Sequence, residues 1–286
     1  MTYKRNVAVK CSLSILIFIS VLLISCAEKK DPLAKVWLYN EDQTKEQVIE
    51  NAQSYGATKD HNLTAANFID LQEDGTFTSY LGTFEKGKWF FKNNNLILVN
   101  EQRERVEFLV NKITGKELVC SNKMKKTVYR FNGEPNTFST PSQNPFSAQN
   151  NQWRIKPMHK ESDAELRARM KNHFGFWEKY FAWGLSEKVD YLDVRSTATP
   201  LKIYGNGFEL QYYEYLFPEW KNNFYDTADC RLAYENLYYK MYEKSIQWPD
   251  TKNRYERFVS AFNQLQGWMD EQTSPYVKHS NKSDPK

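Results

Sequence analysis

The chain opens with one apolar block. Residues 12–24 are almost entirely apolar, and Lys4, Arg5 and Lys10 precede them without any acidic residue. About 13 helical residues span roughly 20 Å, which is short for the ~30 Å hydrocarbon core of a bilayer. A basic start, a short apolar core and a small residue before a cleavage site are typical of a secretory signal. The pattern therefore predicts a signal peptide over residues 1–25.

Between residues 33 and 131, apolar and polar positions alternate at strand spacing. Asp74-Gly75 separates two such runs and predicts a hairpin. A capping box from Thr44 to Gln47 predicts one interrupting helix, which Gly56 would end. A closed antiparallel meander would leave no exposed sheet edge, so we predict a small β-barrel. Its eight strands are expected at 36–39, 68–71, 76–80, 87–91, 96–99, 106–110, 118–120 and 127–131.

Alternation also predicts which side chains point into this barrel. An eight-stranded barrel either fills itself with side chains or encloses one small ligand. Both readings stay open at this point: a packed core, or a pocket for a small apolar ligand. The candidate pocket residues are Trp37, Phe77, Trp89, Phe91, Leu98 and Phe108.

After residue 152 the apolar residues recur every three or four positions. This spacing predicts a mainly α-helical domain over 153–275. Ser162 and Glu165 form a capping box that opens the first helix. Asp226 or Thr227 would open a second helix and Pro249-Asp250 a third. Gly205-Asn206-Gly207 predicts a β-hairpin between the first two. The stripe expected along the first helix is Leu166, Met170, Phe174, Trp177, Phe181 and Leu185.

Two segments lack any apolar period. Residues 132–152 contain three prolines and many Asn, Ser and Gln, which indicates a polar linker between the two domains. Residues 276–286 are predicted to be a disordered tail.

The helical half is rich in aromatic residues. Of the 44 Phe, Trp and Tyr residues, 27 lie after residue 150. Most such rings form a core, but four of them suggest an exposed surface for a protein or glycan partner. These four are Tyr212, Tyr213, Tyr215 and Trp220.

Charge and metal-ligand patterns exclude several classes of function. Without residues 1–25 the chain has 36 basic and 35 acidic residues, so it has no broad attraction for nucleic acid. Cys120 and Cys230 could pair or remain buried thiols, and the four histidines are far apart in sequence. We find no zinc motif, nucleophile elbow or P-loop, and hence predict no metal, no cofactor and no catalytic residue.

Leu23-Ile24-Ser25-Cys26 resembles the lipobox of bacterial lipoproteins. That resemblance implies cleavage between Ser25 and Cys26, lipidation of the Cys26 thiol, and a tether over residues 26–32. Acyl chains contribute about 0.8 kcal/mol per buried CH₂, so several chains give a stable membrane anchor. Ala27 after the cysteine favours the outer membrane, with the periplasmic and surface faces both open.

The string "FIDLQEDGTFTSYLGTFEKGKWFFKNNNLILVN…VEFLVNKITGKELVCS" resembles the small lipocalin-like domains of bacterial lipoproteins, notably those of Bacteroidota. The resemblance covers about residues 33–131 and implies the barrel fold. One departure is Lys35, where that family has a glycine two residues before the first-strand tryptophan. The helical half resembles no family.

These observations give three hypotheses. The first is a membrane-anchored, non-catalytic binding module of the cell envelope. The second is a lipocalin-like carrier of a small apolar ligand. The third is an envelope hydrolase, which would need a catalytic group that the sequence pattern does not reveal.

Overall fold

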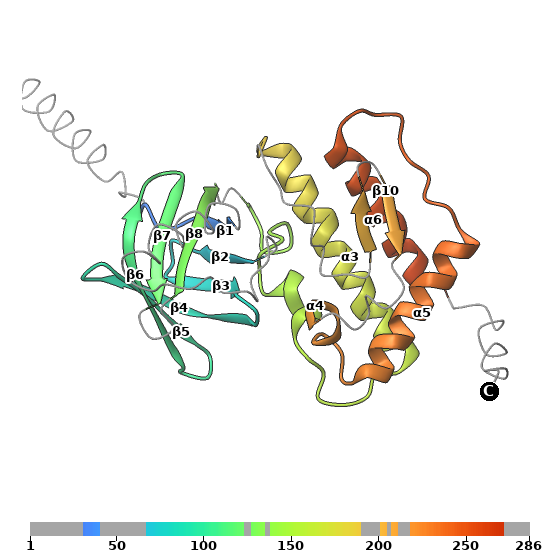
Figure 1. The fold of residues 1–286 in the computed structure, drawn as a ribbon, viewed down its shortest axis with the longest axis horizontal. Helices are drawn as coiled ribbons and strands as arrows, with labels where there is room; N and C mark the ends of the chain where they lie inside the picture. The colour runs from blue at the N-terminus through green and yellow to red at the C-terminus, as the bar shows by residue number, and fades with distance from the viewer. Residues whose placement is uncertain are drawn as a thin grey trace, which may run out of the picture. The chain divides into compact units, whose positions relative to one another are not determined.

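The computed structural model describes residues 31–40, 67–122, 127–134, 138–189, 201–204, 207–210 and 218–271 (Figure 1). The predicted signal peptide, the lipidation site at Cys26, the helix at 44–56 and the tail at 276–286 lie outside these residues. From Leu33 onward the chain forms one compact unit.

The first half forms a closed antiparallel barrel in which eight strands follow each other in chain order, as predicted (Figure 1). The barrel closes because β1 pairs with both β2 and β8, with Trp37 opposite Ile69 and Gly133. β4 and β6 are longer than their apolar runs, and a β-bulge interrupts β6 between Val110 and Lys112. The strands are β1 (Val36–Tyr39), β2 (Phe68–Leu71), β3 (Thr76–Tyr80), β4 (Phe84–Lys92), β5 (Asn95–Asn100), β6 (Arg105–Ile113), β7 (Glu117–Asn122) and β8 (Thr127–Glu134).

Local chemistry explains two of the hairpins. Between β2 and β3, the Thr76 backbone N–H donates to Asp74 Oδ1 at 2.8 Å, and Gly75 has φ +77°. Between β4 and β5, Asn93 and Asn94 have φ values of 52° and 59°, in the left-handed region that Asn tolerates better than most residues. Asp, Asn and Gly therefore stand where the turns require them.

Gly133 makes room for the largest side chain of the barrel interior. A Cβ added to Gly133 would lie 2.7 Å from the ring of Trp37, which is fully buried. The Trp37 indole N–H donates to the Leu33 carbonyl at 2.9 Å, so its one polar atom is satisfied. The close approach of backbone and ring therefore requires a glycine at position 133.

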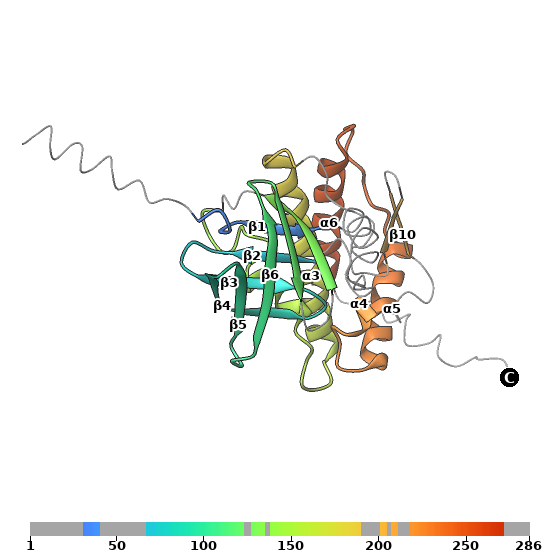
Figure 2. The same cartoon turned by 60° about the vertical axis from the view of Figure 1, so that its left-hand side comes forward.

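The second half is mainly helical (Figure 2). Ser162 and Glu165 form the predicted capping box of α3 (Asp163–Ser186), and Asp226 caps α5 (Thr227–Glu243). The predicted hairpin consists of β9 (Leu201–Tyr204) and β10 (Gly207–Leu210). The third helix begins later than predicted, because Asn253, rather than Pro249-Asp250, accepts hydrogen bonds from the first-turn N–H groups. The remaining helices are η1 (Gln149–Arg154), α4 (Pro218–Lys221) and α6 (Arg254–Asp270).

α3 and α6 lie side by side in both views and form the centre of the helical core (Figures 1 and 2). Phe181 of α3 contacts Phe258 and Phe262 of α6, at ring-centroid distances of 5.0 and 5.8 Å. The predicted stripe on α3 is buried from Leu166 to Phe181, whereas Leu185 is half-buried.

Strands β1–β3 are buried on both faces. Trp37 and Ile69 belong to the barrel core, while their neighbours Val36, Leu38 and Phe68 belong to the helical core. Because successive side chains of a strand point to opposite faces, one short strand supplies two cores. The outer face of the barrel at β1–β3 therefore belongs to the helical core.

The polar segment before α3 joins the two halves. Phe146 is fully buried. Its ring centroid lies 4.9 Å from that of Phe68 in β2 and 5.1 Å from that of Trp183 in α3. The Thr78 hydroxyl donates to the Phe146 carbonyl at 2.7 Å, and the Asn144 amide donates to Asp70 at 2.9 Å. The sequence predicted a linker here. Its described residues pack against both halves.

Asparagine side chains hold this segment in shape. Asn151, which is fully buried, donates to the carbonyls of Pro145 and Ser147 at 2.7 and 2.9 Å. Asn150 donates to the Asn144 carbonyl at 2.7 Å. Polar composition therefore serves to satisfy buried backbone groups in this segment.

Within the described residues, no helix is both long and apolar enough to cross a bilayer.

Candidate functional site

The residues predicted to line a barrel pocket pack against one another. Trp37, Phe77, Leu98 and Phe108 are buried in one cluster, and Trp89 is 8% exposed. Phe108 also meets Tyr129 edge to face at 5.5 Å. Phe91 differs from the others, because 42% of it is exposed.

The predicted partner surface is corrected at Trp220. This side chain is 1% exposed, donates its indole N–H to the Cys230 carbonyl at 3.3 Å and contacts Phe224 at 4.8 Å. Trp220 is therefore a core residue that packs against α5. Tyr212, Tyr213 and Tyr215 lie outside the described residues.

The two cysteines lie in different cores and are not bonded to each other. Cys120 is inside the barrel, where burial raises the pKa of its thiol. Cys230 is in α5, where burial raises its pKa to about 12. Neither thiol has the lowered pKa of a nucleophile.

A segment that the sequence did not single out presents exposed apolar side chains. Residues 155–158, here called the strap, connect η1 to the segment before α3. Within and beside the strap, Met158 is 92% exposed, Ile155 45% and Tyr225 42%. The strap is held by Arg169 of α3, whose Nη1 donates to the carbonyls of Trp153 and Ile155 at 3.0 and 2.9 Å.

A buried ion pair fixes the chain just beyond the strap, at Glu161. Arg169 Nε lies 2.9 and 2.8 Å from the two carboxylate oxygens of Glu161, whose side chain is 7% exposed. The Glu161 backbone N–H donates to Asp229 Oδ2 at 3.1 Å, which joins the segment to the first turn of α5. Side chains of two helices therefore hold the strap in place.

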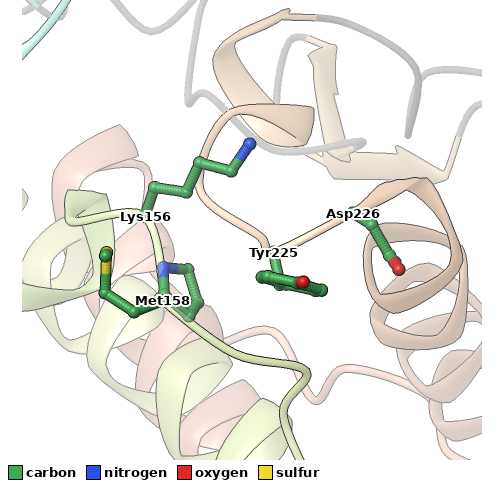
Figure 3. A pocket seen from close by; sticks show the side chains of 5 residues that line it. Lys156, Met158, Tyr225 and Asp226 are labelled. Carbon is green, nitrogen blue, oxygen red and sulfur yellow. The ribbon is translucent and has the colours of Figure 1, made fainter.

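The strap borders a surface hollow of about 590 Å³ (Figure 3). Lys156, Pro157 and Met158 line one side, and Tyr225 and Asp226 line the other. The hollow thus combines an aromatic ring, a thioether, an ammonium group and a carboxylate. Asp226 Oδ1 also accepts the Asp229 N–H as the N-cap of α5, which fixes this carboxylate. Such a surface can bind a ligand that carries both apolar and charged groups.

Beside the strap, Arg154 is buried between the two halves of the chain. Its guanidinium lies 3.9 Å from the ring centroid of Tyr80, 4.2 Å from Trp153 and 4.9 Å from Phe176. Nε donates to Asn151 Oδ1 at 2.9 Å, and the Tyr80 side chain helps to stabilise the charged guanidinium. Burial lowers the pKa of Arg154 to about 10, so it remains charged at neutral pH. Ring faces are its main stabilising surroundings.

His173 lies next to Trp153, one of the rings that surround Arg154. The imidazole stacks on Trp153 at a centroid distance of 3.8 Å and accepts the Trp177 indole N–H at Nε2, at 2.9 Å. A nitrogen that accepts a hydrogen bond carries no proton, so this arrangement holds His173 neutral. The histidine is 2% exposed and packs as a core residue.

The described residues contain no group of three or more His, Cys, Asp or Glu placed to hold a metal ion. The strap was missed in the sequence because its apolar residues follow no period, and exposure cannot be read from residue type. Comparisons with protein-family models, with curated proteins and with solved structures found no match.

Proposed function

We propose that this protein is a lipid-anchored lipoprotein of the cell envelope and a non-catalytic binding module. The signal peptide and the lipobox-like Leu23–Cys26 support the anchor. The strap and its hollow are the proposed contact site for an envelope polypeptide. Ile155, Met158 and Tyr225 would contact apolar side chains of that partner, and Lys156 and Asp226 its charged groups.

One observation carries the binding role. Apolar side chains are exposed on a segment that Arg169 holds on both sides, because it donates to the carbonyls of Trp153 and Ile155 and pairs with Glu161 beyond the strap. Exposed apolar residues on a fixed backbone lose little conformational entropy on binding. Such patches are typical of interaction sites.

The barrel, in this proposal, is a scaffold. Its interior rings pack on one another, and its outer face at β1–β3 contributes to the helical core. A carrier would instead bind its ligand inside the barrel. Native mass spectrometry of the protein from its own membrane separates the two: a bare protein mass supports the scaffold, and a retained small-molecule adduct supports the carrier.

The anchor is tested by fractionation of cells that express the full chain. The wild type should be acylated and remain with the membrane fraction after a salt wash. Cys26→Ser should lose the acyl label and retain its signal peptide. Acylation of the variant equal to that of the wild type would refute the lipobox assignment.

The contact site is tested by a photo-crosslinking residue at Met158 or Tyr225 in cells. A crosslinked polypeptide of one defined mass is expected at both positions, and it should be lost when Lys156→Glu is added. The matched control is Thr83, an exposed turn residue of the barrel. Equal crosslinking at position 83, or none at 158 and 225, would contradict the proposed site.

A further inference from the structure

The barrel topology gathers several turns at the end where the chain enters. Strands reverse direction at each turn, so the start of β1 shares an end with the β2–β3, β4–β5 and β6–β7 turns. Two contacts fix this placement: Lys35 Nζ donates to the Gly115 carbonyl at 2.9 Å, and the Gly133 N–H donates to the Lys116 carbonyl at 2.9 Å. We call this end, with turns 72–75, 93–94 and 114–116, the entry end.

Two exposed phenylalanines lie next to the entry end. Phe90 is 55% exposed and Phe91 42%, and they are followed by the exposed Lys92 and the β4–β5 turn. Phe90 lies opposite Ile97 on the outer face, whereas Phe91 lies opposite the buried Leu96 near the barrel rim. Rings beside a lysine at a hairpin tip are suited to the boundary between lipid headgroups and acyl chains.

Chain length limits how far this end can be from the anchor. Six residues, 27–32, separate Cys26 from Leu33. The seven steps from Cys26 to Leu33 reach about 25 Å when fully extended, at roughly 3.5 Å per residue. A lipid on Cys26 therefore keeps the entry end close to the membrane surface, whatever path the tether takes.

Lysines and acidic residues share this end, with the exposed Glu73 and Asp74 in the β2–β3 turn. Lys112 pairs with Glu117 at 2.6 Å, and Lys88 lies near Asp74 and helps to lower the pKa of that carboxyl. Lys92 and Lys116 have no ion pair among the described residues. Single basic side chains are attracted only weakly to an anionic surface, so the two rings dominate the expected contact.

We propose that Phe90, Phe91 and Lys92 insert into the headgroup region of the membrane that holds the anchor. This contact rests on the proposed lipid anchor on Cys26. It fixes the orientation of the barrel, which is otherwise limited only by the tether. The tilt of the barrel, and hence the direction in which it presents its partner site, then follows from the hairpin as well as from the lipid.

The test uses the full lipidated protein in vesicles of phosphatidylethanolamine with a minor fraction of phosphatidylglycerol. A bimane dye is attached to Lys92→Cys, or to Thr83→Cys in the turn at the opposite end. The buried native thiols Cys120 and Cys230 remain unlabelled. Two readouts are taken: flotation of the protein with the vesicles, and quenching of the dye by headgroup nitroxide lipids.

The expected result is flotation of both proteins with strong quenching at position 92 and little at 83. Adding Phe90→Ser and Phe91→Ser to Lys92→Cys should abolish the quenching without loss of flotation or of circular dichroism. Phe90→Ser alone, at an exposed site, serves as a second variant if the pair impairs folding.

Four results would overturn the proposal. Equal quenching at 92 and 83 with normal flotation would leave the anchor intact and refute the contact. Quenching that persists without both rings would refute their role. Disulfide crosslinking of unlabelled Lys92→Cys into dimers would show that a second copy covers the rings. Failure to float would refute the lipid anchor itself, and the contact with it.

Discussion

The barrel core and the helical core differ in how far apart in the sequence their residues lie. The barrel core comes from consecutive strands whose inward residues alternate with period two, and its members follow each other in sequence. The helical core brings together α3, α6, Phe146, Trp153 and the outer face of β1–β3. A core built of local repeats can be read from a sequence, whereas a core shared by distant segments cannot. Because β1–β3 belong to both, we expect the two halves to depend on each other for stability.

Phe146→Ala should have the largest effect, because this ring contacts both halves and is fully buried. Truncation of a buried phenylalanine costs about 3–5 kcal/mol. Native-state thiol exchange measures the result separately in each core, at Cys120 in the barrel and Cys230 in α5. Both thiols should react faster by similar factors.

Phe90→Ala, at an exposed position, is the matched control and should leave both rates unchanged. Faster exchange at Cys230 alone would show that the halves unfold independently, which would restore the interpretation of residues 132–152 as a linker between two domains.

Asn144→Ala should have the next largest effect. The Asn144 amide donates to Asp70, a carboxylate on the outer face of β2 that is 1% exposed. Loss of a hydrogen bond to a buried charged group costs about 1.5–3 kcal/mol. Urea unfolding checks this, with the exposed Gln143→Ala as control. An unchanged midpoint would mean that the segment contributes nothing to joining the two halves.

Arg154 separates the contribution of charge from that of packing at the same junction. Arg154→Lys should destabilise by about 1–2 kcal/mol, because an ammonium group cannot stack on Tyr80 and Trp153 as a guanidinium does. Arg154→Met should lie within about 1 kcal/mol of the wild type, since an apolar side chain of similar volume avoids burying a charge. The urea concentrations at the unfolding midpoints of the two variants are compared with that of the wild type. A methionine variant less stable than the lysine variant would show that the positive charge itself is required.

The smallest effects concern one carboxylate in each half. Hydrogen bonds from Ser162 hold the pKa of Glu165 below its ordinary value, and hydrogen bonds from Thr76 do the same for Asp74. The folded form therefore favours the ionised group. This stabilisation is complete above the ordinary pKa of about 4 and is lost as the pH falls through the lowered value.

Glu165→Gln and Asp74→Asn should each be slightly less stable than the wild type at neutral pH, and the difference should shrink in acid. Unfolding curves across that pH range provide the measurement. A difference that stays constant with pH would mean that the charge of the carboxylate has no part in the cap or turn.

The strap shows how little of a binding surface can be predicted from one sequence. The backbone on either side of Met158 is held by Arg169 of α3, which donates to the Ile155 carbonyl, and by Asp229 of α5, which accepts the Glu161 N–H, and both partners are distant in sequence. The four residues chosen from the sequence were aromatic and adjacent, but Trp220 proved to be buried. Aromatic content alone does not distinguish a surface from a core.

Local structure follows from the sequence alone. The alternation around Trp37 and Phe77, the Asp74-Gly75 turn and the Ser162–Glu165 capping box each involve neighbours within a few residues, where propensity and hydrogen bonding act directly. Contacts between segments distant in sequence determine what covers the outer face of β1–β3. They also determine which groups the asparagines at 144, 150 and 151 bind. An amide side chain can hydrogen-bond to water or to a buried carbonyl equally well. Which it does depends on whether distant chain segments exclude the water.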